Sequence, residues 1–340
     1  MELKMKDIAR KAGVSVTAVS FALNGKDGIS EKTREKILRI VEEEGYTAKK
    51  PAQKKEEASR LIFLLYPVSG NSSEEENGDT YSFYEIMQKV EKQIHTYKYN
   101  LFFKSVPMQG DFRKEVEKII SFYQVEGMIV VGTQMSPGQI RTLKDIDIPM
   151  VVIDRFFQEL NIDCIAFDNF AGAYAAVTYL IGKNHRRIGY VGTHSENKNM
   201  TERRDGFTAA LKDRGLQADP TCCMFDIKGS SQERWAQLLE NPRLMPGAFL
   251  VENDYLAIDI IKELQGAGVK VPEDVSVIGF ENTVVADLIA PELTSVEIPW
   301  DRMASLAVRR LMEKMDERTE ETLKIKISTR MVIRKSCREI

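Results

Sequence analysis

From Leu61 onward, apolar segments typical of buried strands alternate with segments of helical periodicity, and this alternation constrains the fold more than any other feature. The strand-like segments are 61–68, 101–106, 127–133, 149–154, 164–167, 187–192, 247–252 and 275–280. The helix-like segments include 83–97, 115–123, 171–181, 202–214 and 256–266. Such alternation predicts parallel sheets that are covered by helices on both faces.

The run of strand–helix units is too long for one compact sheet. We therefore predict an α/β core of two doubly wound parallel-sheet subdomains, with a break near residues 155–164. Ligands of such sheets bind at the carboxyl ends of the strands. Two facing sheets would thus form a ligand cleft between them.

The N-terminal segment 6–46 carries three short helical patterns, which predict an all-α headpiece. At about 100° per residue, the middle pattern has a packing face and an outer face. The packing face consists of Ala18, Val19, Ala22 and Leu23, and the outer face of Val16, Thr17, Ser20, Phe21 and Asn24. The turn before it contains Gly13, and Ser15 and Ser30 are good N-caps for the second and third helices. This arrangement predicts a helix-turn-helix, whose second helix enters the DNA major groove. A three-helix bundle that binds no nucleic acid is the alternative.

Charge is distributed unevenly along the chain. The net charge is −3 overall, but residues 1–60 contain more Lys and Arg than Asp and Glu, whereas the remainder is acidic. A basic N-terminal segment followed by an acidic remainder suits an N-terminal DNA-binding domain. Residues 47–60 are charged, lack large apolar side chains and contain Pro51, which predicts a linker. We therefore divide the chain into 1–47, a hinge at 48–60 and a core at 61–340.

Several classes of protein are disfavoured by what the sequence lacks. It has no apolar run after a basic start and no stretch of 18 apolar residues, so we expect a cytoplasmic protein without a membrane span. Four cysteines lack the spacing of a zinc site or a disulfide framework: Cys164, Cys222, Cys223 and Cys337. No nucleotide-binding or hydrolase motif is present. We expect no enzyme, no metal and no cofactor; a transport-type sugar-binding protein is the second alternative.

The stretch KDIARKAGVSVTAVSFALNG, followed by GISEKTREKILRIVEEEGY, resembles the headpiece of the lac repressor/galactose repressor family of bacterial transcription regulators. The resemblance implies that Val16, Thr17 and Phe21 meet base edges, Phe21 through an apolar contact. It also implies that phosphates, which position the protein without reading sequence, are contacted by Ser15, Ser20 and Asn24. Lys6 belongs to the same expected DNA-binding set.

In this family the linker holds a short hinge helix that inserts a leucine into the minor groove. Here Lys55 stands at the position of that leucine, and Pro51 lies inside the would-be helix. A lysine cannot unstack a base step as an apolar wedge does. We therefore expect phosphate contacts from Lys49, Lys50, Lys54 and Lys55, and the bending of DNA stays open.

The core resembles the same family through IAFDNFAGAYAAVTYLIGKNHRRIGYVG, ERRDGFTAAL, LVENDYLAIDIIKELQGAGVKVPEDVSVIGFEN and the ending MVIRKSC. This implies a periplasmic-binding-protein-like core, with one subdomain at about 61–160 and 297–322 and the other at about 161–296 and 323–340. The implied effector contacts are Phe83, Tyr84, Asp154, Phe167, Asp168, Arg203, Asn253, Asp254, Glu281 and Trp300. Glu281 departs from the usual aspartate, so the identity of the ligand cannot be carried over.

Aromatic rings with Asp, Asn and Arg side chains suit a carbohydrate. The resemblance implies a repressor whose affinity for a pseudo-palindromic operator is modulated by a sugar or a sugar derivative. We expect a homodimer, because the two-fold symmetry of the protein is mirrored in the operator and no heptad tail follows the core.

Overall fold

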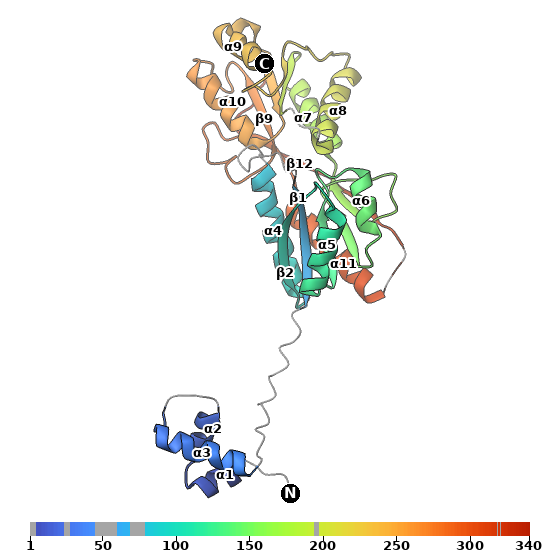
Figure 1. The fold of residues 1–340 in the computed structure, drawn as a ribbon. Coiled ribbons are helices and arrows are strands. Elements are labelled where there is room, and N and C mark those ends of the chain that lie inside the picture. The colour runs from blue at the N-terminus through green and yellow to red at the C-terminus, as the bar shows by residue number, and fades with distance from the viewer. Residues whose placement is uncertain are drawn as a thin grey trace. The chain divides into compact units, whose positions relative to one another are not determined.

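The computed structural model describes residues 5–23, 28–44, 60–68, 79–193, 197–317, 319 and 321–340. The chain divides into two compact units, Met1–Ser59 and Arg60–Ile340 (Figure 1). In the parts of the chain that the structure describes, no helix is long and apolar enough to cross a membrane.

The first unit contains three helices, α1 (Met5–Ala12), α2 (Val16–Leu23) and α3 (Glu31–Glu43). Their small core consists of Ile8, Ala9, Ala12, Val19, Ala22 and Ile37, and Ala18 and Leu23 pack against it. The predicted packing face of α2 is therefore confirmed.

Both predicted N-caps of this unit are also confirmed. The Ser15 hydroxyl accepts a hydrogen bond from the main-chain N–H of Ala18 at 3.1 Å. The Ser30 hydroxyl accepts one from the N–H of Thr33 at 3.2 Å. Each cap satisfies an amide that the first turn of a helix leaves without an intrahelical partner.

The second unit contains two six-stranded sheets. The first has the order β11-β5-β4-β3-β1-β2 and the second the order β12-β10-β9-β8-β6-β7. The strands of the first sheet are β1 (Leu61–Val68), β2 (Asn100–Pro107), β3 (Gly127–Val131), β4 (Met150–Ile153), β5 (Cys164–Phe167) and β11 (Lys324–Ile327). Those of the second are β6 (Ile188–Gly192), β7 (Cys223–Phe225), β8 (Ala248–Val251), β9 (Ser276–Glu281), β10 (Thr294–Glu297) and β12 (Arg330–Val332). Apart from the antiparallel pair of β10 and β12, neighbouring strands are parallel, as predicted.

Helices cover both faces of each sheet (Figure 1). They are α4 (Asp79–Thr96), α5 (Phe112–Tyr123), α6 (Pro137–Lys144), α7 (Asn169–Gly182), α8 (Lys198–Asp213), α9 (Gln232–Glu240), α10 (Asp254–Gly266) and α11 (Trp300–Glu317), with a 3-10 turn at Pro242–Leu244. On β1, Ile62 and Leu64 pack with α4 and α11, whereas Phe63 and Leu65 pack with α5 and α6. Burial on both faces explains why β1 reads as a continuous apolar run.

Two predicted boundaries between the subdomains are wrong. The segment 164–167 was assigned to the second subdomain, but β5 pairs with β4 in the first sheet. The segment 324–327 was assigned there as well, but β11 pairs with β5. The chain therefore passes between the two lobes after Phe167, after Glu297 and after Ile327.

A buried carboxylate fixes β11 at the edge of the first sheet. Asp163 Oδ1 accepts hydrogen bonds from Arg310 Nε at 2.7 Å and from the N–H of Leu323 at 2.9 Å. Lys314 Nζ lies 2.8 Å from Asp163 Oδ2. These contacts join α11, the entry to β5 and the entry to β11, so the strand is held where sequence periodicity alone did not place it.

Candidate functional site

The polar residues of the predicted cleft follow strands of both sheets. Asp154 follows β4 and Asp168 follows β5 in the first lobe. Asn253 follows β8, and Glu281 ends β9, in the second lobe. Because the carboxyl ends of parallel strands meet at one edge of a sheet, these residues come from the edge at which ligands of such folds bind.

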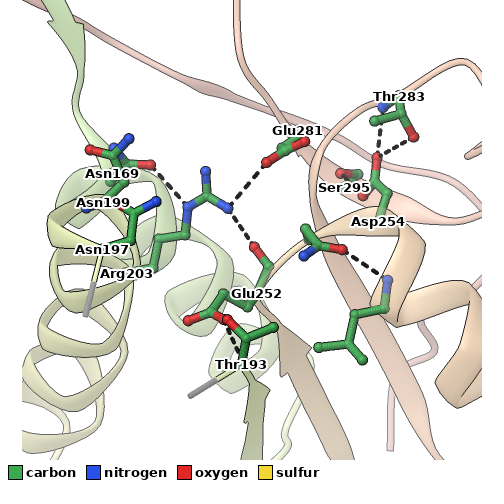
Figure 2. A network of polar contacts seen from close by, with 12 residues as sticks. Asn169, Thr193, Asn197, Asn199, Arg203, Glu252, Asp254, Glu281, Thr283 and Ser295 are labelled. Carbon is green, nitrogen blue, oxygen red and sulfur yellow. Dashed lines mark hydrogen bonds and ion pairs between the residues drawn. The ribbon is translucent and has the colours of Figure 1, made fainter. Parts of the chain in front are cut away.

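Arg203 on α8 lies at the centre of a buried polar network (Figure 2). Its Nε donates to Asn169 Oδ1 at 2.9 Å, and its Nη1 donates to the main-chain carbonyl of Glu252 at 2.5 Å. The same Nη1 lies 3.5 Å from Glu281 Oε1. The guanidinium carbon also lies 3.9 Å from the centre of the Phe280 ring. The structure thus brings the predicted Arg203 and Glu281 into direct contact.

Glu252, which the sequence did not single out, is a further member of this network. Its carboxylate accepts from the Tyr190 hydroxyl at 3.1 Å and from the N–H and hydroxyl of Thr193 at 2.6 and 2.7 Å. Burial raises the pKa of Tyr190 well above its usual range, and the adjacent Glu252 carboxylate adds to this effect. Its place directly after the buried strand β8 is the signal that could have identified Glu252.

The carboxylate of Asp254, a predicted ligand contact, binds groups of the protein itself. Its carboxylate accepts from the N–H of Thr283 at 2.6 Å and from the Ser295 hydroxyl at 2.6 Å (Figure 2). A Cβ atom on Gly279 would lie 2.3 Å from Asp254 Oδ1, so the carboxylate packs directly against the β9 backbone. Burial raises the pKa of Asp254 from 3.8 to about 6. These contacts indicate that Asp254 stabilises the loop after β9.

Asp154 and Glu281 both adopt a left-handed backbone conformation, with φ of 62° and 104° respectively. Side-chain-bearing residues rarely adopt positive φ, and such residues gather at functional sites. Asp154 Oδ2 accepts the Thr133 hydroxyl at 2.5 Å, and its Oδ1 accepts the Asn199 amide at 3.1 Å. These two carboxylates lie at the ends of β4 and β9, one in each lobe.

Two of the expected contacts serve as helix caps. Asp168 Oδ1 accepts from the N–H of Ala171 at the start of α7, at 3.0 Å. Asn253 Oδ1 accepts from the N–H of Leu256 at the start of α10, at 2.8 Å. One oxygen of each side chain is therefore committed to its own helix.

The aromatic residues form two separate groups. Phe83 is buried, and its ring centre lies 4.3 Å from that of Tyr66 and 4.7 Å from that of Phe103. The Phe167 and Trp300 rings meet edge to face at 4.9 Å. A small hollow beside the first group is lined by Tyr66, Phe83, Thr133, Gln134 and Asp154, among others. Tyr84 is 54% exposed, which makes it the expected contact that is most open to solvent.

In the headpiece, the outer face of α2 is open to solvent at its start. Val16 and Thr17 are exposed, and Ser20 and Phe21 are half-buried. A Cβ atom on Gly28 would lie 2.9 Å from the Phe21 ring, so this ring packs against the loop before α3. Lys6 and Ser15 are also exposed. The expected contacts Asn24, Lys49, Lys50, Lys54 and Lys55 lie outside the described residues.

Comparison with known families identifies the headpiece. Residues 4–49 match the family of bacterial regulatory proteins, lacI family. The headpiece is a lacI-family helix-turn-helix domain. Residues 177–337 match a periplasmic binding protein-like domain, as is expected for the core of a lacI-family member.

Relatives of the chain in the lacI family align along nearly its whole length. It is 27% identical over 339 residues to the HTH-type transcriptional repressor PurR of Photobacterium profundum, covering 99% of both chains. It is 28% identical over 340 residues to the ribose operon repressor of Haemophilus influenzae, covering 98% of both. The lac repressor dimer bound to operator and the anti-inducer ONPF has the same fold, with a TM-score of 0.69, 21% identity and coverage of 99% of this chain and 100% of that chain. The predicted family and fold class are therefore confirmed.

Within the described ranges, no group of three or more His, Cys, Asp or Glu residues is placed to hold a metal ion. One buried guanidinium, several buried carboxylates and several aromatic rings can hold a compact polar ligand.

Proposed function

We propose that the protein is a sequence-specific DNA-binding transcriptional repressor whose operator affinity is modulated by a small polar molecule in the core cleft. Residues 1–47 would form the DNA-binding headpiece and residues 48–60 the hinge. The observation that carries the proposal is the exposed outer face of α2, at Val16 and Thr17, in a segment that matches the lacI family. A helix with such a face can enter the major groove.

The polar network around Arg203 supports an effector of the sugar class. Hydroxyl groups both donate and accept hydrogen bonds, so one hydroxyl can meet a guanidinium and a carboxylate together. The ribose operon repressor of Haemophilus influenzae is a relative whose name refers to a sugar. We assign Arg203, Glu281 and Asp154 to polar contacts with the effector, and Phe83, Phe167 and Trp300 to the apolar walls.

A homodimer with two headpieces would bind a pseudo-palindromic operator. An effector that changes how the two lobes sit would alter the spacing of the headpieces. Such coupling is reciprocal, so the operator must change the affinity for the effector by the same factor.

The test of this function is selection of preferred sequences from a random duplex library with the full-length protein. We expect enrichment of a two-fold symmetric site, and an affinity for it that falls steeply with salt. A transport-type sugar-binding protein would bind sugars but would enrich no sequence. If the duplexes recovered after several rounds of selection share no common sequence, the proposal is contradicted.

A thermal-shift screen of sugars and related polyols, repeated with the selected operator present, then identifies the effector. A ligand that stabilises the protein and changes operator affinity fits the proposal. A ligand that stabilises the protein equally with and without operator would show that the two sites are not coupled.

A further inference from the structure

The charge of Arg203 is compensated inside the cleft. Its Nη1 lies 3.5 Å from Glu281 Oε1, and the side chains of Arg203 and Glu281 are only 3% and 9% exposed. Figure 2 shows the guanidinium between Asn169, Glu281 and the main chain of Glu252. Arg203 therefore has an anionic partner and two neutral acceptors that the protein itself provides.

Further charged side chains of both signs lie near this pair. Glu252 is buried next to Arg203, whose guanidinium its carbonyl accepts, and the buried Asp154 binds Asn199 on the same helix as Arg203. Two further arginines near the pair have partners of their own. Arg204 lies over the Phe225 ring, at 5.2 Å, and Arg334 donates to the carbonyl of Leu293 and to Asn282 Oδ1.

Binding of an anionic ligand beside this pair would be energetically unfavourable. It would bring a negative charge beside buried carboxylates, while the guanidinium that could neutralise it is already paired with Glu281. A buried charge without a compensating partner is strongly unfavourable. An uncharged hydroxyl instead can donate to the Glu281 carboxylate and accept from Arg203, so it can join the pair without breaking the charge balance.

We propose that Glu281 determines the charge of the ligand, so that the cleft accepts uncharged polyhydroxyl molecules and excludes their phosphorylated and carboxylated counterparts. This inference rests on the proposed effector-binding function of the cleft.

The test compares Glu281→Gln, which removes the charge and keeps the size, with Glu281→Asp, which keeps the charge. Calorimetry on the full-length protein at constant ionic strength would measure binding of inorganic phosphate, glucose, glucose 6-phosphate, ribose and ribose 5-phosphate. We expect Glu281→Gln to gain at least tenfold in affinity for a phosphate-bearing probe. The gain should be lost in the double variant Glu281→Gln/Arg203→Gln, and Glu281→Asp should behave like the wild type.

Two results would overturn the inference. One is saturable binding of a phosphate-bearing probe to the wild-type protein that Arg203→Gln abolishes. The other is no gain for any anionic probe when Glu281→Gln is folded, as judged by circular dichroism. Glu281→Ser removes the same charge and replaces Glu281→Gln if that variant does not fold. Failure of the regulatory function would appear separately, as the absence of a preferred DNA sequence, and would leave the calorimetric result readable.

Discussion

Asn199 donates its side-chain amide to both the carboxylate and the main-chain carbonyl of Asp154, at 3.1 and 3.0 Å. Asn199 lies on α8 of the second lobe, whereas Asp154 follows β4 of the first. Arg203 lies one helical turn further along α8 and binds Glu281 and Glu252 of the second lobe. One turn of α8 thus contacts both walls of the cleft, so a ligand between them would be sensed by the same helix.

Replacing Asn199 by alanine should weaken the association of the two lobes. A hydrogen bond to a charged group contributes about 1.5–3 kcal/mol, and the second bond to the carbonyl is lost as well. Small-angle scattering should show a larger radius of gyration for Asn199→Ala than for Lys198→Ala, an exposed neighbour. Identical scattering of the two variants would show that this contact does not hold the lobes together.

Removing both partners of the buried pair should cost less stability than the sum of the two single removals. Arg203→Ala leaves Glu281 without its cation, and loss of one partner of a buried pair destabilises by about 3–5 kcal/mol. Denaturant unfolding of Arg203→Ala, Glu281→Ala and the double variant forms a cycle. We expect the double variant to be more stable than the sum of the single effects implies. Additive effects would mean that the pair contributes no coupling energy.

The recognition helix should read bases through Thr17 and Phe21. Thr17→Ala should change the preference at one base pair in each half-site by about 1–3 kcal/mol. Phe21→Ala should change base preference and also destabilise the headpiece, because its ring packs against Gly28. Binding to operators with single base-pair changes, together with thermal melting, separates these effects. Unchanged preference in both variants would refute this assignment.

The buried carboxylate of Asp254 should make stability depend on pH. Burial raises its pKa from 3.8 to about 6, so the folded state binds a proton more tightly than the unfolded state. The stabilisation is therefore full at low pH and is lost as pH rises through about 6, by about 3 kcal/mol for a pKa difference of about two between the folded and unfolded states. The stability of wild type relative to Asp254→Asn should fall between pH 4 and pH 7. Asp287→Asn, an exposed change in the same lobe, is the control; parallel profiles for wild type and Asp254→Asn would contradict this prediction.

The lysines of the hinge should act as an electrostatic tether. Each phosphate that a lysine neutralises steepens the log–log dependence of affinity on salt by about 0.9. Replacing Lys54 and Lys55 by alanine should flatten this slope for operator and for nonspecific DNA alike, leaving their affinity ratio nearly unchanged. Strong operator bending that disappears in Lys55→Ala would show instead that this position deforms the DNA.

Local patterns predicted much of this protein. The apolar segments 61–68 and 127–131 are strands because they are buried on both faces of a sheet. Burial on both faces leaves a continuous apolar run in the sequence. Ser15 and Ser30 cap helices because capping involves residues only three positions apart. The headpiece was predictable for a similar reason, since its three short helices follow one another closely along the chain.

Tertiary structure decided which sheet each strand joins and which polar groups meet. β5 belongs to the first sheet because it pairs with β4, and β11 because it pairs with β5. The contact of Asp163 with Arg310, which lies far along the chain, supports this arrangement. Asp254 was expected to contact ligand, but it packs against Gly279 and binds Ser295 instead. Periodicity reports the burial of one residue relative to its near neighbours. It carries no information on pairing between distant segments, and the charge balance of Arg203 and Glu281 is set by such a pairing.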